Sequence, residues 1–281
     1  MAKLNGKYIS GIIGNLCFQK RGNQQIIRRR TVRGRIRQSE ATRACSADFG
    51  RVSKLARLFR KSLSGLFCGF YDGSMCPRLV ARVSAVVNSD HSNPRGMRQF
   101  QKGNLSLMDG FDFNAAAPMV LTLQVQPLVE EVSGQLRIRL PQTDKSQIKA
   151  PRGATGCNFL IQCTVFNFRD QRHICLLQEE INWSFATGSF GGTQIKQDLN
   201  GLSGCVMMIG LSIVFYRELR GAKMLVSPQG NSSAILKVAK IEDTENEGSE
   251  NELTRNPVDS KNEPPLLPFR GKDSKIASAS G

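Results

Sequence analysis

The residues best suited to chemistry in this sequence are arginines crowded into one short segment. Arg28, Arg29 and Arg30 are consecutive, and three more arginines follow at every second position, Arg33, Arg35 and Arg37. If residues 32–37 are extended, these last three lie on one face, about 6.6 Å apart. Phosphates along one DNA strand repeat about every 3.4 Å, so such a row could meet every second phosphate. Guanidinium groups also bind phosphate through paired hydrogen bonds. The segment therefore predicts binding to a polyanion.

A helix is predicted directly after the arginines, with Ser39 as its N-cap and Glu40 in its first turn. Its apolar residues recur at intervals of three and four, which indicates one buried helical face: Phe49, Val52, Ala56, Phe59 and Leu63. Basic residues lie on another face of the same helix. They complete the predicted polyanion-binding set, which is Arg28, Arg29, Arg30, Arg33, Arg35, Arg37, Lys54, Arg57 and Lys61.

A β-hairpin is predicted to precede the arginines and to hold them in place. The strands Leu16–Gln19 and Gln24–Ile27 flank a turn at Gly22 and Asn23, residue types that tolerate the positive φ of a tight turn. A second helix is predicted from about Met75 to Val87. Together these elements predict a basic hairpin-and-helix module over residues 1–113.

The net charge of +16 belongs to this first part of the chain. Residues 1–100 hold 20 Lys/Arg and 4 Asp/Glu, whereas residues 101–281 hold 19 of each. Such a basic segment fits nucleic acid, an acidic surface of a protein partner, or a solvated face without a partner. Aromatic residues are scarce within the run, so recognition of particular bases is not expected.

The middle of the chain, residues 114–240, is predicted to be an antiparallel β-sandwich of the Ig-like kind. From about Met119 the apolar residues alternate with polar ones, as in half-buried strands, and about seven such runs are separated by turn residues. Trp183 is expected in or beside the core of this sandwich. The overall fold class is therefore α+β.

The last region, residues 241–281, is predicted to be a disordered tail. It opens with an acidic run, Glu242 to Glu252, and continues with several prolines, a composition that buries too little apolar surface to fold. Its one apolar island, Pro264–Phe269, is either a docking motif or a chance cluster. The acidic run could also compete with an external anion for the arginines.

Patterns for catalysis or metal binding are not found. The eight cysteines have no Cys-X-X-Cys spacing, and His91 and His173 are isolated, so no metal site and no cofactor are expected. Glu179 and Glu180 would face opposite sides of a strand, which is unsuitable for joint acid–base work. No apolar stretch approaches the roughly 20 residues of a membrane span, and no secretion signal is recognised. We therefore expect a non-enzymatic protein of the cytoplasm, with no membrane partner.

The start of the chain resembles a protein family of Bacteroidota that has no established activity. The resemblance rests on patches of the first 115 residues: Asn5-Gly6, Ser10–Leu16, Phe18, Gly22, Ile27–Arg29, Gln38, Ala41-Thr42, Phe49 and Gly110–Asn114. It implies a bacterial source and an N-terminal hairpin followed by helices. No functional residue is transferred by it.

The leading hypothesis is a binding protein that engages nucleic acid or another polyanion without strong sequence preference. The alternative is a structural subunit of a bacterial or phage-like assembly, in which the basic arm docks on an acidic surface of a neighbouring subunit. Such an assembly could be a homo-oligomer.

Overall fold

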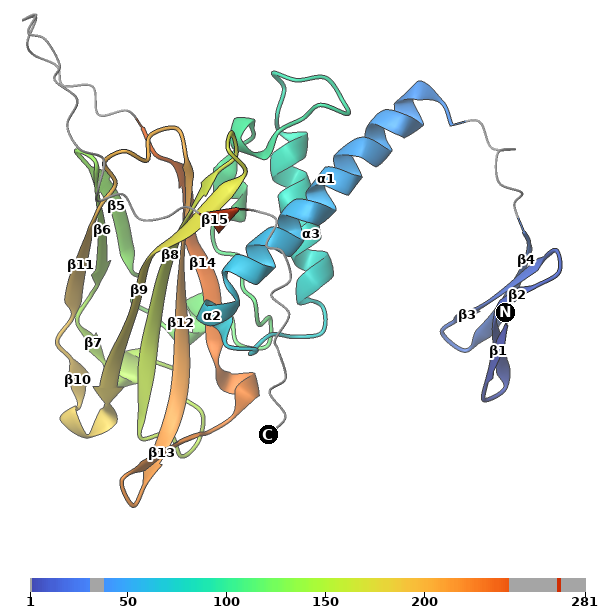
Figure 1. Ribbon diagram of the computed structural model, residues 1–281. Helices are drawn as coiled ribbons and strands as arrows, with labels where there is room; N and C mark the ends of the chain where they lie inside the picture. Colours follow the sequence, from blue (N-terminus) through green and yellow to red (C-terminus); the bar gives the residue numbers. More distant parts are fainter. Residues whose placement is uncertain (1, 31–37, 243–266, 269–281) are drawn as a thin grey trace, which may run out of the picture. The chain divides into compact units, whose positions relative to one another are not determined.

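The computed structural model describes residues 2–30, 38–242 and 267–268 (Figure 1). The chain is α+β, with a large share of antiparallel strands. It divides into two compact units, Met1–Ser46 and Ala47–Gly281. The helix α1 (Glu40–Ser62) begins in the first unit and continues in the second.

The first unit is built on a four-stranded antiparallel sheet in the order β1-β2-β3-β4. The predicted hairpin is present as its last two strands, and two further strands precede it. The strands are β1 (Lys3–Asn5), β2 (Tyr8–Ile13), β3 (Leu16–Arg21) and β4 (Gln24–Arg29). Gly11, with φ of 120°, lies where β2 begins to pair with β3, and glycine tolerates this conformation without steric cost.

The second unit contains a large and a small antiparallel sheet. The large sheet has the order β13-β12-β8-β9-β15, and β14 also pairs with β12. Its strands are β8 (Gly156–Asn167), β9 (Arg172–Ser184), β12 (Val206–Leu219), β13 (Ala222–Leu225), β14 (Ser232–Lys240) and β15 (Leu267–Pro268). The small sheet has the order β11-β6-β5, with β5 (Leu128–Val132), β6 (Gln135–Leu140) and β11 (Thr193–Asp198). The short strands β7 (Thr143–Asp144) and β10 (Ser189–Phe190) pair with each other.

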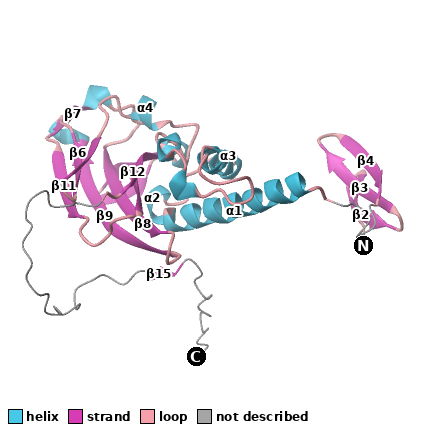
Figure 2. Ribbon diagram, turned by 90° about the horizontal axis from the view of Figure 1, so that it is seen from above, coloured by secondary structure: helices cyan, strands magenta, loops and turns pink. Residues whose placement is uncertain are grey.

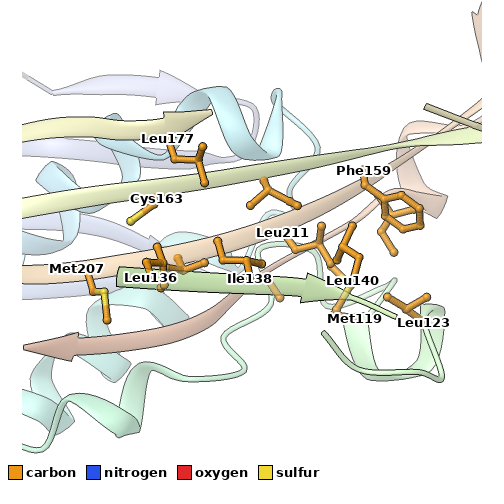
Figure 3. Close-up of a cluster of buried hydrophobic side chains, with 14 of the residues drawn as sticks. Met119, Leu123, Leu136, Ile138, Leu140, Phe159, Cys163, Leu177, Met207 and Leu211 are labelled. Carbon is orange, nitrogen blue, oxygen red and sulfur yellow. The ribbon is translucent and has the colours of Figure 1, made fainter. Parts of the chain in front are cut away.

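One face of the large sheet packs against the small sheet. Because side chains alternate along a strand, the odd-numbered residues of β8 and β12 point to this face. Phe159, Cys163 and Leu211 are buried there together with Leu136 and Ile138 of β6 (Figure 3). Trp183 is buried in the same cluster, which confirms the prediction made from the usual burial of tryptophan.

The opposite face of the large sheet is covered by helices (Figure 2). Phe166, Val206 and Met208 share a buried cluster with Phe59 of α1 and Leu79 of α3. The helices that form this layer are α1, α2 (Ser64–Phe67) and α3 (Met75–Asn88), and α3 confirms the helix predicted after residue 75. The sequence placed a division near residue 113, but the helices share this core with the sheet, and the compact units meet at residue 46.

Two local predictions are corrected. The alternation from Met119 predicted a strand, but Met119–Thr122 forms the short helix α4. Met119 and Leu123, the residue that follows the helix, are both buried. Pro118 starts this turn, and its carbonyl accepts the Thr122 hydroxyl at 2.9 Å. Phe49 was expected on the buried face of α1, but its side chain is 64% exposed.

The predicted disordered tail lies mostly outside the described residues. Of residues 241–281, the structure describes Ile241, Glu242, Leu267 and Pro268. The acidic run beyond Glu242 lies outside them.

Candidate polyanion-binding surface

The strand β4 positions two of the predicted arginines. In the antiparallel register with β3, Arg28 is opposite Cys17 and Arg29 is opposite Leu16. Since consecutive residues of a strand point to opposite faces, these two arginines lie on different faces of the sheet. Both side chains are exposed, and the Arg28 guanidinium donates a hydrogen bond to the side-chain oxygen of Gln19.

Arg30 follows the end of β4, and its backbone is anchored. Its N–H donates to the carbonyl oxygen of Asn15 at 2.6 Å, while its side chain is exposed. The arginines expected to form a single row, Arg33, Arg35 and Arg37, lie outside the described residues. Within the described part, three consecutive exposed arginines therefore lie at the end of β4, with Arg28 and Arg29 on opposite faces of the sheet.

More basic residues lie on this sheet than the sequence singled out. Lys20 and Arg21 occupy the turn end of β3, next to Gly22. The Lys20 and Lys7 ammonium groups lie 4.7 and 5.5 Å from the centre of the buried Tyr8 ring. The residue types alone could have marked Lys20 and Arg21, because they flank the predicted turn. Their grouping with Tyr8 depends on the fold of the sheet.

Lys54, Arg57 and Lys61 form a separate group on α1. All three are exposed, and they lie on the side of the helix away from its buried residues Val52 and Phe59. Burial first, and the positive charge of Lys61 second, lower the pKa of His173 of β9. Lys54, Arg57 and Lys61 belong to the second unit, whereas the arginines at the end of β4 belong to the first. The structure therefore shows which residues are close within each group, and it says nothing of the distance between the groups.

The basic side chains of both groups are not used in ion pairs with described residues. Among these residues, the ion pairs are Arg51 with Asp48 and Arg78 with Asp72. In addition, residues 1–46 contain 11 Lys/Arg and a single acid, Glu40. Within the described residues, their charge is therefore not neutralised by an ion pair.

A groove in the described second unit was considered as a catalytic site. One open groove of about 450 Å³ is lined by Asp109, Asp112, Met119 and Lys237, among other residues. Burial raises the pKa of both carboxyl groups. Each accepts a backbone N–H at 2.8 Å, from Val238 for Asp109 and from Met119 for Asp112. These carboxylates hold loops onto β14 and α4, and the groove does not gather a nucleophile with a base.

Thiol chemistry is also disfavoured in the core. Burial raises the pKa of Cys157 and of Cys163 to about 12, so both stay protonated at neutral pH. Groups of three or more potential metal ligands are not found in the described residues. None of the helices in the described ranges combines the length and the apolar character needed to cross a membrane.

No protein-family model, curated protein or solved structure that was compared with the chain matches it. The resemblance to a Bacteroidota family stays a prediction from the residues quoted above.

Proposed function

We propose that the protein is a non-enzymatic binding protein that engages nucleic acid or a similar polyanion through its basic first unit. The observation that carries this proposal is the exposure of Arg28, Arg29 and Arg30 at the end of one strand, in a unit with a single acidic residue. Arginine forms strong charge-assisted hydrogen bonds with phosphate, and clustered positive charge speeds the approach of an anion.

The proposed contact is with phosphates and not with bases. Tyr8 is buried and Phe18 is half-buried, so described aromatic rings of the first unit are not presented for stacking. The binding is therefore expected to depend steeply on salt and weakly on sequence. A cytoplasmic location, where nucleic acid is present, is part of this proposal.

The test is binding to a duplex of about 30 base pairs, measured by fluorescence anisotropy over a range of salt concentrations. Changing Arg28, Arg29 and Arg30 to Ser should reduce the log–log salt slope by up to about 3, because each phosphate contact contributes about 0.9. The matched control changes three basic residues on the outer face of the small sheet, Arg137, Arg139 and Lys196, to Ser. Absence of binding at low salt, or an equal loss in both variants, would contradict the proposal.

A second function is favoured by a different observation. The same unit exposes large apolar side chains, including Leu4, Ile13, Leu16 and Ile27, at 76, 52, 43 and 56%. Exposed apolar groups within one small sheet favour a protein interface. The alternative is therefore a structural subunit whose first unit docks on a neighbouring subunit. Two results together would favour this alternative. Sedimentation would show a homo-oligomer that is lost when Leu16 and Ile27 are changed to Asp, and the protein would not bind DNA.

We also propose an Ig-like arrangement for the two sheets of the second unit. Along the chain, β5 and β6 pair in the small sheet, and β8 and β9 pair in the large one. Then β11 returns to β6, and β12 returns to β8. This alternation between two packed sheets is typical of Greek-key sandwiches.

A further inference from the structure

The large sheet has an edge at β9, and a segment distant in sequence is paired with it. The inner side of β9 pairs with β8 along its whole length. At its beginning, Arg172 and His173 also pair in antiparallel fashion with Pro268 and Leu267 of β15 (Figure 1). An edge strand presents unpaired N–H and C=O groups, which is the usual basis of strand addition.

The sequence around β15 is suited to an added strand. Pro264, Pro265 and Pro268 disfavour a helix, and a residue that precedes proline, such as Leu267, prefers extended conformations. Proline is tolerated at the edge of a sheet, where its missing N–H is not needed. The segment Pro264–Phe269 therefore loses little conformational freedom on pairing.

The receiving end of β9 lies beside aromatic side chains. The ring of His173 stacks on Phe166 with 5.8 Å between ring centres. Phe168 lies 6.2 Å from Phe166 and 5.8 Å from Phe100, and its side chain is half-buried. Phe166 and Phe100 are themselves buried, so the partly exposed rings of His173 and Phe168 form the accessible part of this cluster. An apolar extended peptide fits such an edge better than a charged one does.

We propose that the beginning of the β9 edge, at Arg172 and His173, is a peptide-binding edge that is occupied by the segment of the same chain that contains Leu267 and Pro268. Residues 243–266 connect the segment to the sheet, and such a connection can extend to about 80 Å, so it is long enough to reach. A ladder of two residue pairs is weak, so the contact is reversible, but the tether gives the segment an effective concentration in the millimolar range. This inference does not rest on the polyanion-binding proposal.

The experiment is hydrogen–deuterium exchange of the full chain, followed by mass spectrometry of peptides that cover residues 170–176. Leu267→Asp should increase exchange in these peptides several-fold, because a charged residue disfavours pairing of the segment with this edge. The matched control, Ile276→Asp, adds the same charge to the tail outside the segment and should leave exchange unchanged. A synthetic peptide of residues 262–272, added at millimolar concentration to the Leu267→Asp variant, should restore slow exchange.

Three results would overturn the proposal. The first is equal exchange of residues 170–176 in the wild type and in Leu267→Asp. The second is an equal increase in the Ile276→Asp control. The third is slow exchange that disappears on dilution of the wild type, since this would assign the paired segment to a second copy of the chain.

Discussion

The two units of the chain differ in what is buried and in what is offered to solvent. In the second unit, apolar clusters cover both faces of the large sheet. In the described part of the first unit, Tyr8 is the large apolar residue that is buried, whereas Leu4 and Ile27 are more than half exposed. A small sheet with so little buried surface has little stability of its own. The comparison teaches that the second unit contains the large apolar cores, whereas the described first unit leaves most of its large apolar side chains exposed.

Removal of a large side chain should show the biggest difference between the units. Phe59 is fully buried, with ring centres of Phe100 and Phe166 each 5.0 Å away, so Phe59→Ala should lower the free energy of unfolding by about 3–5 kcal/mol. Ile27→Ala, on the exposed sheet, should change it by less than about 0.5 kcal/mol. Guanidinium unfolding measures both, followed by Trp183 fluorescence for Phe59→Ala and by far-ultraviolet circular dichroism, which also reports the first unit, for Ile27→Ala. Similar losses in the two variants would contradict the comparison.

A smaller effect is expected where a strand meets a helix in the second unit. A Cβ atom at Gly210 of β12 would lie 2.2 Å from a methyl carbon of Leu66, so Gly210→Ala should cost about 1–3 kcal/mol of unfolding free energy. Gly50→Ala in α1 is the control, because its Cβ meets no atom within 4 Å and alanine favours a helix. Combining Gly210→Ala with Leu66→Ala should cost less than the sum of the single changes. Additive losses would show that the contact is not tight.

The dependence of stability on pH should also arise in the second unit. The buried Asp90 carboxylate accepts hydrogen bonds from the Ser92 hydroxyl at 2.6 Å, from Asn93 and from the Gln99 N–H, and these hold its pKa well below the usual range. A lowered pKa in the folded state stabilises the protein above the ordinary value of about 3.9, and this contribution is lost as the pH falls further. Asp90→Asn should therefore lower the melting temperature by several degrees at pH 7, with a difference that shrinks towards pH 2. A constant difference at all pH values would be inconsistent with a role for the charge.

The smallest effect is expected at the start of α1, near the boundary of the units. The Ser39 hydroxyl accepts the Thr42 N–H at 3.2 Å, as an N-cap does. Ser39→Ala should destabilise the first turn by about 0.5–2 kcal/mol. Because this turn is exposed, amide exchange over residues 41–46 should increase while the Trp183 unfolding curve stays in place. A shift of that curve would indicate that the units are more strongly coupled than their cores suggest.

Much of the local structure could be predicted from residue patterns. Apolar residues at intervals of three and four predicted α1 and α3, and alternation predicted β6 and β8. The pattern misled at Met119, because an apolar run of a few residues fits a helical turn as well as a strand. Of the candidate site, the exposure of Arg28, Lys54 and Arg57 was predictable, since charged side chains avoid burial. The residues that lie opposite Arg28 and Arg29 in the sheet, Cys17 and Leu16, could be identified only from the register of β4 with β3.

The sequence by itself determined the class of fold and the uneven charge, because periodicity and composition are properties of short segments. Only the tertiary structure decided which elements share a core. The helices of the first hundred residues pack on a sheet formed by residues 156–240, and a two-residue strand near the end pairs with β9. Such contacts join residues that are far apart in the chain. They are selected by burial of complementary apolar surfaces, which no local pattern specifies.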